Sequence, residues 1–194
     1  MTDPEFASND ANGHRFWPST PMNKVKRFVS ISALLAVMAF TALSQTVLTG
    51  LDGSLVDVQG QKGKVVVLAI GALWVPLSNK QVDYTNALAN RYKGRDVVVY
   101  FVSADSSDPK SRNFAADDAI RSFVATTKLS VPLLRDADGA TTGKKFRVDQ
   151  VPSFVILDKT GSAAAAAFGG IDTDPKGADP LARVTRAIDK LLNS

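Results

Sequence analysis

Cysteine and histidine, which serve most readily as nucleophile, general base and soft metal ligand, are almost absent from this 194-residue sequence. The absence of cysteine excludes disulfides, thiolate metal sites, cysteine nucleophiles and thiol redox chemistry by the chain's own side chains. The one histidine, His14, lies in a polar leader, so histidine metal sites and Ser-His-Asp catalysis lack their central residue. We therefore expect no catalytic residue of these classes, no metal site and no cofactor.

Carboxylates are the remaining candidates for chemistry. Asp105, Asp108, Asp117 and Asp118 cluster around one polar segment, where their oxygens could ligate calcium. Their spacing matches no known calcium loop, and Asp117 is better placed to cap a helix. Nothing in the sequence selects a pair of carboxylates for glycoside chemistry. A pocket with two carboxylates of strongly shifted pKa would favour an enzyme of unrelated chemistry.

The charges of the chain indicate no nucleic-acid partner. The formal net charge is +4, and after the leader Lys144 and Lys145 form the only adjacent basic pair. A nucleic-acid-binding protein concentrates basic residues on one face. We expect instead a mixed, solvated surface.

The first fifty residues differ from the rest. Basic residues at 24–27 precede an uncharged stretch at 28–51, whose apolar part ends near the small residues Ala42 and Ser44. A basic region, an apolar region and small residues at a cleavage site are typical of a secretory signal peptide, here at 22–44.

An uncleaved membrane anchor is the alternative, because the uncharged stretch is long enough to span a bilayer as a helix. Residues 28–48 would then contact the membrane, and the basic flank keeps the N-terminus in the cytoplasm either way. Both alternatives export residues 45–194 as one domain, periplasmic or anchored facing the periplasm. Residues 1–21 are a polar leader: a cloning remnant, the product of a mis-set start, or a cytoplasmic tail.

Two continuous β-branched runs, at 65–70 and 97–102, predict strands that are buried on both faces of a sheet. Between them, residues 76–92 place Leu77, Gln81, Tyr84, Leu88 and Tyr92 at helical spacing, which predicts a helix with one mostly apolar face. A strand, a helix and a strand at this spacing form a βαβ unit, so we expect the two strands to be parallel.

The second half of the chain predicts shorter elements. Asp117 would cap a short helix, and a short strand would follow at 131–134. Runs at 153–157 and 163–168, separated by a turn, predict an antiparallel hairpin. Asp179 as N-cap and Pro180 as first helical residue would open a final helix, with a buried stripe of Leu181, Val184, Ile188, Leu191 and Leu192.

The order of these elements and several phrases resemble the thioredoxin-like proteins of the TlpA/ResA type, related to AhpC/TSA proteins. The phrases lie at 51–68, 74–78, 131–136 and 151–161, in the family's order and spacing. The resemblance implies a thioredoxin-like α/β fold, with a central mixed β-sheet flanked by helices. It also implies that Pro152 is the family's cis-proline.

The family's chemistry does not carry over. Trp74-Val75-Pro76-Leu77-Ser78 occupies the place of the family's Trp-Cys-x-x-Cys, so the two cysteine positions hold Val75 and Ser78. The family's reaction needs a thiolate at a helix N-terminus, which valine and serine cannot supply. The residues before the motif also differ from the family, which favours natural loss of the cysteines over engineered removal.

The resemblance also implies a peptide-binding groove between the motif loop and the cis-proline loop. Its lining would comprise Trp74, Val75, Pro76, Ser78, Val151 and Pro152. The alternative is a scaffold role, in which Trp74 covers the core, Pro76 begins a helix and Pro152 holds a bend.

We therefore expect an exported, redox-inactive domain that binds a protein or peptide partner in the cell envelope, or acts there structurally. The alternative is a protein that descends from a thiol-disulfide redox pathway, or a variant of such a protein whose cysteines were removed. It would bind the partners of that pathway without exchanging disulfides with them. Insulin reduction by the purified chain would refute the redox-inactive prediction.

Overall fold

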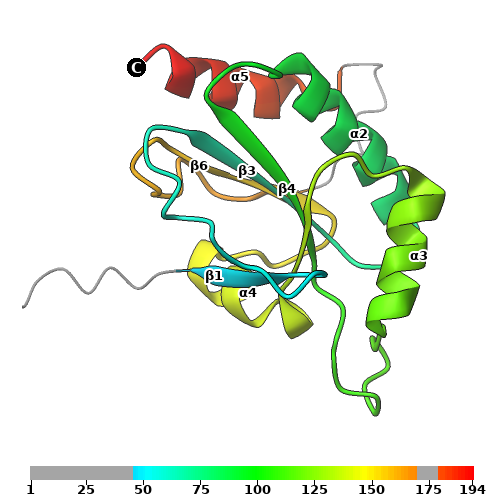
Figure 1. The fold of residues 1–194 in the computed structure, drawn as a ribbon. Coiled ribbons are helices and arrows are strands. Elements are labelled where there is room, and N and C mark those ends of the chain that lie inside the picture. Colours follow the sequence, from blue (N-terminus) through cyan, green and yellow to red (C-terminus); the bar gives the residue numbers. More distant parts are fainter. Residues whose placement is uncertain (1–45, 170–178) are drawn as a thin grey trace, which may run out of the picture. The chain divides into compact units, whose positions relative to one another are not determined.

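The structure is a computed structural model that describes residues 46–169 and 179–194 (Figure 1). The chain divides into two units at residues 43 and 44, and all described residues lie in the second. The polar leader at 1–21 and the predicted signal peptide or anchor at 22–44 thus fall outside the described residues. No helix within the described part is long and apolar enough to cross a membrane.

A seven-stranded mixed sheet forms the centre of the described domain, in the order β2-β1-β5-β4-β3-β6-β7. Strand β3 pairs in parallel with β4, and β4 in parallel with β5, whereas the other neighbours are antiparallel. The predicted βαβ unit and mixed sheet are therefore confirmed. The strands are β1 (Val47–Gly50), β2 (Leu55–Asp57), β3 (Val65–Gly71), β4 (Val97–Ser103), β5 (Leu133–Arg135), β6 (Ser153–Leu157) and β7 (Phe168–Gly169).

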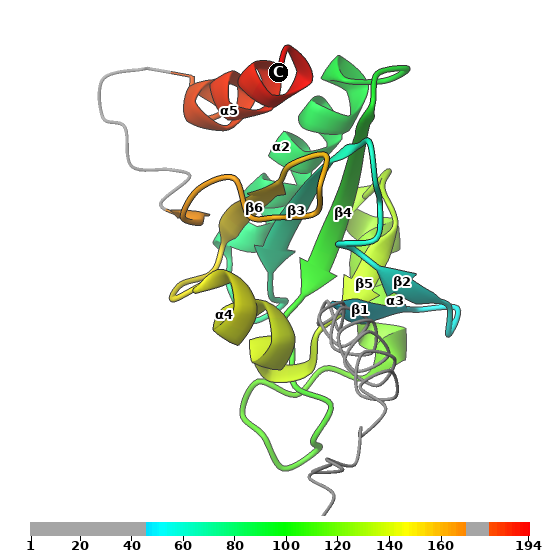
Figure 2. The same ribbon diagram turned by 90° about the vertical axis from the view of Figure 1, so that its left-hand side faces the viewer.

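Helices cover both faces of the sheet (Figures 1 and 2). Buried side chains of α2, α3 and α5 share one hydrophobic cluster, and Phe146 of α4 belongs to the cluster on the other face. The helices are α2 (Leu77–Arg91), α3 (Asp117–Thr127), α4 (Ala140–Phe146) and α5 (Ala182–Leu192), with a 3-10 turn η2 (Ala137–Gly139) before α4.

Strand β3 joins the two halves of the core. Its alternate residues enter different clusters: Val65, Val67 and Ala69 pack with α2 and α5, and Val66, Leu68 and Ile70 pack on the opposite face. This alternation follows from the two-residue period of a strand. All seven residues of β3 are buried, as its unbroken β-branched run predicts.

The buried face of α2 differs from the predicted one. Leu77 is 44% exposed and Tyr84 only half-buried, although both were expected on the apolar face. Polar side chains occupy the buried face because they find hydrogen-bond partners there, which burial of a polar group requires. The buried residues of α2 are Ser78, Gln81, Val82, Thr85 and Leu88.

Two helix starts also differ from the predictions. Ala116 is the N-cap residue of α3, and Asp117 lies in the first turn, where its carboxylate pairs with Arg135 instead of capping the helix. Helix α5 begins at Ala182, not at Pro180. The Asp179 carboxylate accepts the Leu181 N–H at 2.9 Å, so its hydrogen bond closes a turn before the helix.

The predicted hairpin forms only in part. Strand β6 pairs antiparallel with β7, but β7 is Phe168–Gly169, and the alanine-rich segment before it contributes one isolated bridge, Ala163 to Leu157. Alanine has a low strand propensity and little side chain to pack, which accounts for the shorter strand. The sequence analysis also missed β1 and β2.

Candidate functional site

The motif loop joins the end of β3 to the start of α2. The Val75 N–H donates to the Ala72 carbonyl at 3.1 Å, and the Ser78 N–H donates to the Val75 carbonyl at 2.9 Å. These two turns place Val75 just before Pro76, the N-cap residue of α2, and Ser78 in the first turn of the helix. The positions that correspond to the family's cysteines thus lie at a helix N-terminus, as the resemblance implies.

Ser78 is a structural residue in this loop. Its side chain is buried, and its Oγ accepts the N–H of Ala72 at 3.1 Å. Val75 is half-buried and offers no polar group. A serine nucleophile needs a base within hydrogen-bond reach. Among the described residues, the hydrogen bond of Ser78 Oγ comes from the Ala72 backbone N–H.

The cis-proline loop lies beside this motif loop. The Val151–Pro152 peptide bond is cis, as the resemblance implies. Ile70 at the end of β3 pairs with Ser153 at the start of β6, so the motif loop and Pro152 meet at one end of the sheet. Pro152 is buried and Val151 is half-buried.

The side chain of Gln81 connects the two loops by hydrogen bonds to their backbone. Its Nε2 donates to the Ile70 carbonyl at 3.1 Å and to the Ser153 carbonyl at 2.8 Å, although the residue is fully buried. Its Oε1 has no hydrogen-bond partner among the described residues. The amide needs space in front of it: a Cβ at Gly71 would lie 2.5 Å from Oε1 and 2.7 Å from Cζ of Phe101.

Asp105 of the segment after β4 holds the motif loop by hydrogen bonds to its backbone. The Leu73 N–H donates to both carboxylate oxygens, at 2.9 and 3.1 Å, and the Ser103 hydroxyl donates to one of them at 2.8 Å. Burial of the carboxyl raises the pKa of Asp105, and the hydrogen bonds from Ser103 and Leu73 oppose that rise. The residue is 1% exposed.

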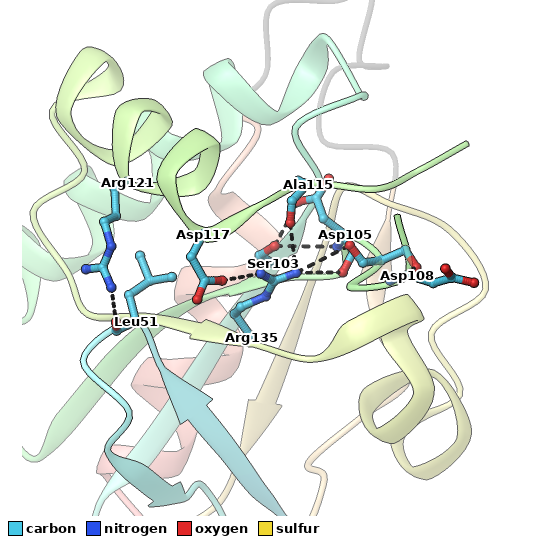
Figure 3. A network of polar contacts seen from close by, with 9 residues as sticks. Leu51, Ser103, Asp105, Asp108, Ala115, Asp117, Arg121 and Arg135 are labelled. Carbon is cyan, nitrogen blue, oxygen red and sulfur yellow. Dashed lines mark hydrogen bonds and ion pairs between the residues drawn. The ribbon is translucent and has the colours of Figure 1, made fainter. Parts of the chain in front are cut away.

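Arg135 of β5 fixes the segment that follows Asp105 (Figure 3). Its guanidinium donates to the backbone carbonyls of Asp105, Ser106 and Ala115, at 3.5, 3.4 and 3.1 Å. It also forms an ion pair with Asp117 at the start of α3. Two carboxylates of the candidate calcium cluster therefore already have partners. Asp105 accepts hydrogen bonds from Leu73 and Ser103, and Asp117 pairs with Arg135.

A cavity of about 270 Å³ opens beside the two loops. Trp74 from the motif loop and Val151 from the cis-proline loop both line it, so the structure brings these two predicted residues together. Val75, Pro76, Ser78 and Pro152 are not among its lining residues. The other walls come from β3, the segment after β4, and the region around α4: Ile70, Ala104, Asn113, Asp138, Gly139, Thr142, Gly143, Val148, Asp149 and Gln150.

An apolar surface lies next to this cavity. Trp74 is 52% exposed and Leu77 is 44% exposed, and both belong to the motif segment. About half of the Trp74 side chain is therefore open to solvent. The sequence analysis missed Gln81, Asp105 and Arg135 as supports of the site, and Asp138 and Asp149 as walls of the cavity. The only available signal was a polar residue beside a buried strand or on the core face of a helix.

The comparisons with known proteins agree with this fold. The family model described as Redoxin matches residues 23–188. The chain is 29% identical over 115 residues to a thiol-disulfide oxidoreductase ResA from Bacillus thuringiensis, a match that covers 59% of this chain and 61% of the relative. The chain thus matches less than two thirds of that relative's length.

Two solved structures show the same fold. A thiol:disulfide interchange protein DsbE from Chlorobium tepidum, described as putative by its authors, has a TM-score of 0.59 at 20% identity, over 76% of this chain and 93% of its own. An exposed lipoprotein thioredoxin from Streptococcus pneumoniae has a TM-score of 0.58 at 20% identity, over 75% and 98%. The thioredoxin-like fold is therefore confirmed, and with the Redoxin match over most of its length the chain belongs to the Redoxin family.

Proposed function

We propose that this protein is an exported, redox-inactive thioredoxin-like module that binds an extended peptide segment of a protein partner in the cell envelope. The binding surface would be the groove between the motif loop and the cis-proline loop. One observation carries the proposal: a motif loop and a cis-proline loop lie side by side and are joined by a buried amide, while both cysteine positions hold other residues.

Exposure at the motif supports binding over a purely structural role. Trp74 and Leu77 present large apolar side chains to solvent, 52% and 44% exposed. Exposed apolar groups that gather beside a cavity are typical of interaction sites. The groove would offer these side chains and the backbone of the Val151 region to a partner strand, in the manner of strand addition.

Export rests on the leader and on similarity. Residues 22–44 have the order of regions that a signal peptide has, and one structural neighbour is described as an exposed lipoprotein. An alkaline phosphatase fused after residue 194 tests this in a bacterial host. Phosphatase activity supports export, and its absence with normal expression contradicts it. N-terminal sequencing of the mature protein distinguishes cleavage near Ser44 from anchoring.

Site-specific photo-crosslinking tests the binding surface. A benzophenone amino acid at Leu77 should crosslink a partner in envelope preparations of the native host, and the change Val75→Asp should abolish the product. Leu55 on β2 provides the matched control because it is also an exposed leucine, at 73% against 44%. Equal products from both positions, or a product that Val75→Asp leaves intact, would contradict the groove.

A redox-pathway protein by descent is the second candidate, and the similarity to ResA favours it. Such a protein would bind the same partners as its cysteine-containing relatives without exchange. Addition of this chain should then slow the reduction of those partners by an active relative, in proportion to its concentration. Unchanged rates at saturating concentration would exclude shared partners and leave the first candidate.

A further inference from the structure

We propose that the 270 Å³ cavity is the specificity pocket of the groove and takes the cationic side chain, lysine or arginine, of a bound peptide. This inference rests on the proposed function, since it names the class of peptide that the groove would select. Trp74 and Val151 belong to the proposed groove and also line the cavity. A peptide that lies across the two loops would therefore place one of its side chains at the mouth of the cavity.

The charge of the cavity wall selects a cation. Asp138 and Asp149 are the charged residues among its lining residues, which include no lysine or arginine. Neither carboxylate has a hydrogen-bond or ion-pair partner in the described part of the chain. The neighbouring segment has three basic residues, Lys144, Lys145 and Arg147, and none of them lines the cavity.

The apolar wall suits the stem of such a side chain. Lysine and arginine bury their methylene stems along apolar surface while the charged head stays near polar groups. Ile70, Val148 and Val151 supply aliphatic contact, and Trp74 adds an indole that attracts cations to its face. A volume of 270 Å³ lies below the usual range for small-molecule sites, which fits one side chain rather than a whole ligand.

The turn that carries Asp138 is held in place by a buried carboxylate. Asp136 accepts the N–H groups of Thr141 and Thr142, at 2.9 and 2.6 Å, and the Thr142 hydroxyl at 2.7 Å. The Gly139 N–H closes a turn onto the Asp136 carbonyl at 2.8 Å, and Asp138 within that turn has a left-handed φ of 60°. A fixed backbone lowers the ordering cost when a cation binds.

Fluorescence of Trp74 in the full chain tests the pocket. The chain has two tryptophans, so Trp17→Phe leaves Trp74 as the only indole. The probes are N-acetyl-lysine methylamide and its uncharged analogue, N-acetyl-norleucine methylamide. We expect the lysine probe to bind at least about fivefold more tightly, and added salt to reduce the difference.

Variants assign the effect to the two carboxylates. The double change Asp138→Asn with Asp149→Asn should reduce the affinity of the lysine probe to that of the norleucine probe. The control Asp118→Asn removes an exposed carboxylate of α3 that does not line the cavity, and should change nothing. Equal affinities of the two probes, or an undiminished preference in the double variant, would overturn the cation pocket.

A random octapeptide library separates this inference from the proposed function. Enrichment of lysine or arginine that Asp138→Asn with Asp149→Asn removes, together with loss of binding in Leu77→Asp, supports both. Peptides that bind through Leu77 without basic enrichment overturn the pocket and leave the groove. Binding of the lysine probe with no peptide binding overturns the groove and leaves the pocket.

Discussion

The side-chain amide of Gln81 donates a hydrogen bond to the backbone carbonyl of Ser153, 2.8 Å away. This bond joins helix α2, which begins at the motif loop, to the strand that follows cis-Pro152. The same amide donates to the Ile70 carbonyl at 3.1 Å. One buried side chain thus ties together the two loops of the candidate groove.

The change Gln81→Leu should lower the free energy of unfolding by about 1 kcal/mol, because two buried carbonyls lose a donor while the volume stays similar. Loss of the unpartnered Oε1 offsets part of the cost. Urea denaturation measures the change. Asn90→Leu, at an exposed amide of the same helix, is the control and should stay within about 0.5 kcal/mol. An equal effect of both changes would contradict this role.

The space in front of Gln81 requires glycine at position 71. In Gly71→Ala the new Cβ would lie 2.5 Å from Gln81 Oε1 and 2.7 Å from Phe101 Cζ, both in the core. We expect about 1–3 kcal/mol of destabilisation by thermal or urea unfolding. Gly143→Ala is the matched control, because its Cβ would meet no atom closer than 3.7 Å and alanine favours a helix. Destabilisation by Gly143→Ala as large as that by Gly71→Ala would contradict the crowding argument.

Much of the fold follows from hydrophobic pattern, whereas the supports of the site do not. Strands β3 and β4 are continuous apolar runs rich in valine, a pattern typical of strands that are buried on both faces of a sheet. The roles of Gln81 and Asp105 depend on carbonyl and N–H groups that the fold brings from distant segments, such as Ser153. The local periodicity of the sequence does not reveal those partners. It also assigned Leu77 to the buried face of α2, where the structure has polar residues such as Gln81.

The raised pKa of Asp105 predicts a pH dependence of stability. In the unfolded chain its pKa is about 3.8, and burial raises it in the folded protein. Between the two values the folded state binds more protons than the unfolded state, so this residue's contribution falls as the pH rises. We therefore expect Asp105→Asn to gain stability relative to the parent protein as the pH rises above about 3.8.

The difference between the two proteins, measured by urea unfolding at each pH, isolates Asp105. Asp158 acts in the opposite direction, because hydrogen bonds from Thr160 lower its pKa and its contribution is lost as the pH falls. That contribution is common to both proteins and cancels in the difference. A difference that is constant with pH, or that changes in the opposite sense, would show that Asp105 does not titrate as its burial predicts.

The retained frame predicts that cysteines would restore thiol chemistry. The hydrogen bond from the Ser78 N–H to the Val75 carbonyl closes a turn, and the ends of such a turn lie within about 7 Å. This separation suits a disulfide, and the N-terminus of α2 would lower the thiol pKa of a cysteine at 75. The double change Val75→Cys with Ser78→Cys should therefore form an intrachain disulfide and accelerate insulin reduction by dithiothreitol above the rate with the parent chain.

The control is Val75→Cys with Asn79→Cys, which displaces the second thiol by one residue to an exposed position. This pair should accelerate insulin reduction much less, because its side chains leave the turn geometry. Mass spectrometry after thiol alkylation counts the free cysteines in each variant. The prediction is contradicted if the 75/78 pair stays reduced in air, or reduces insulin no faster than the control. The backbone around positions 75 and 78 would then be unsuited to thiol-disulfide exchange even with both cysteines present.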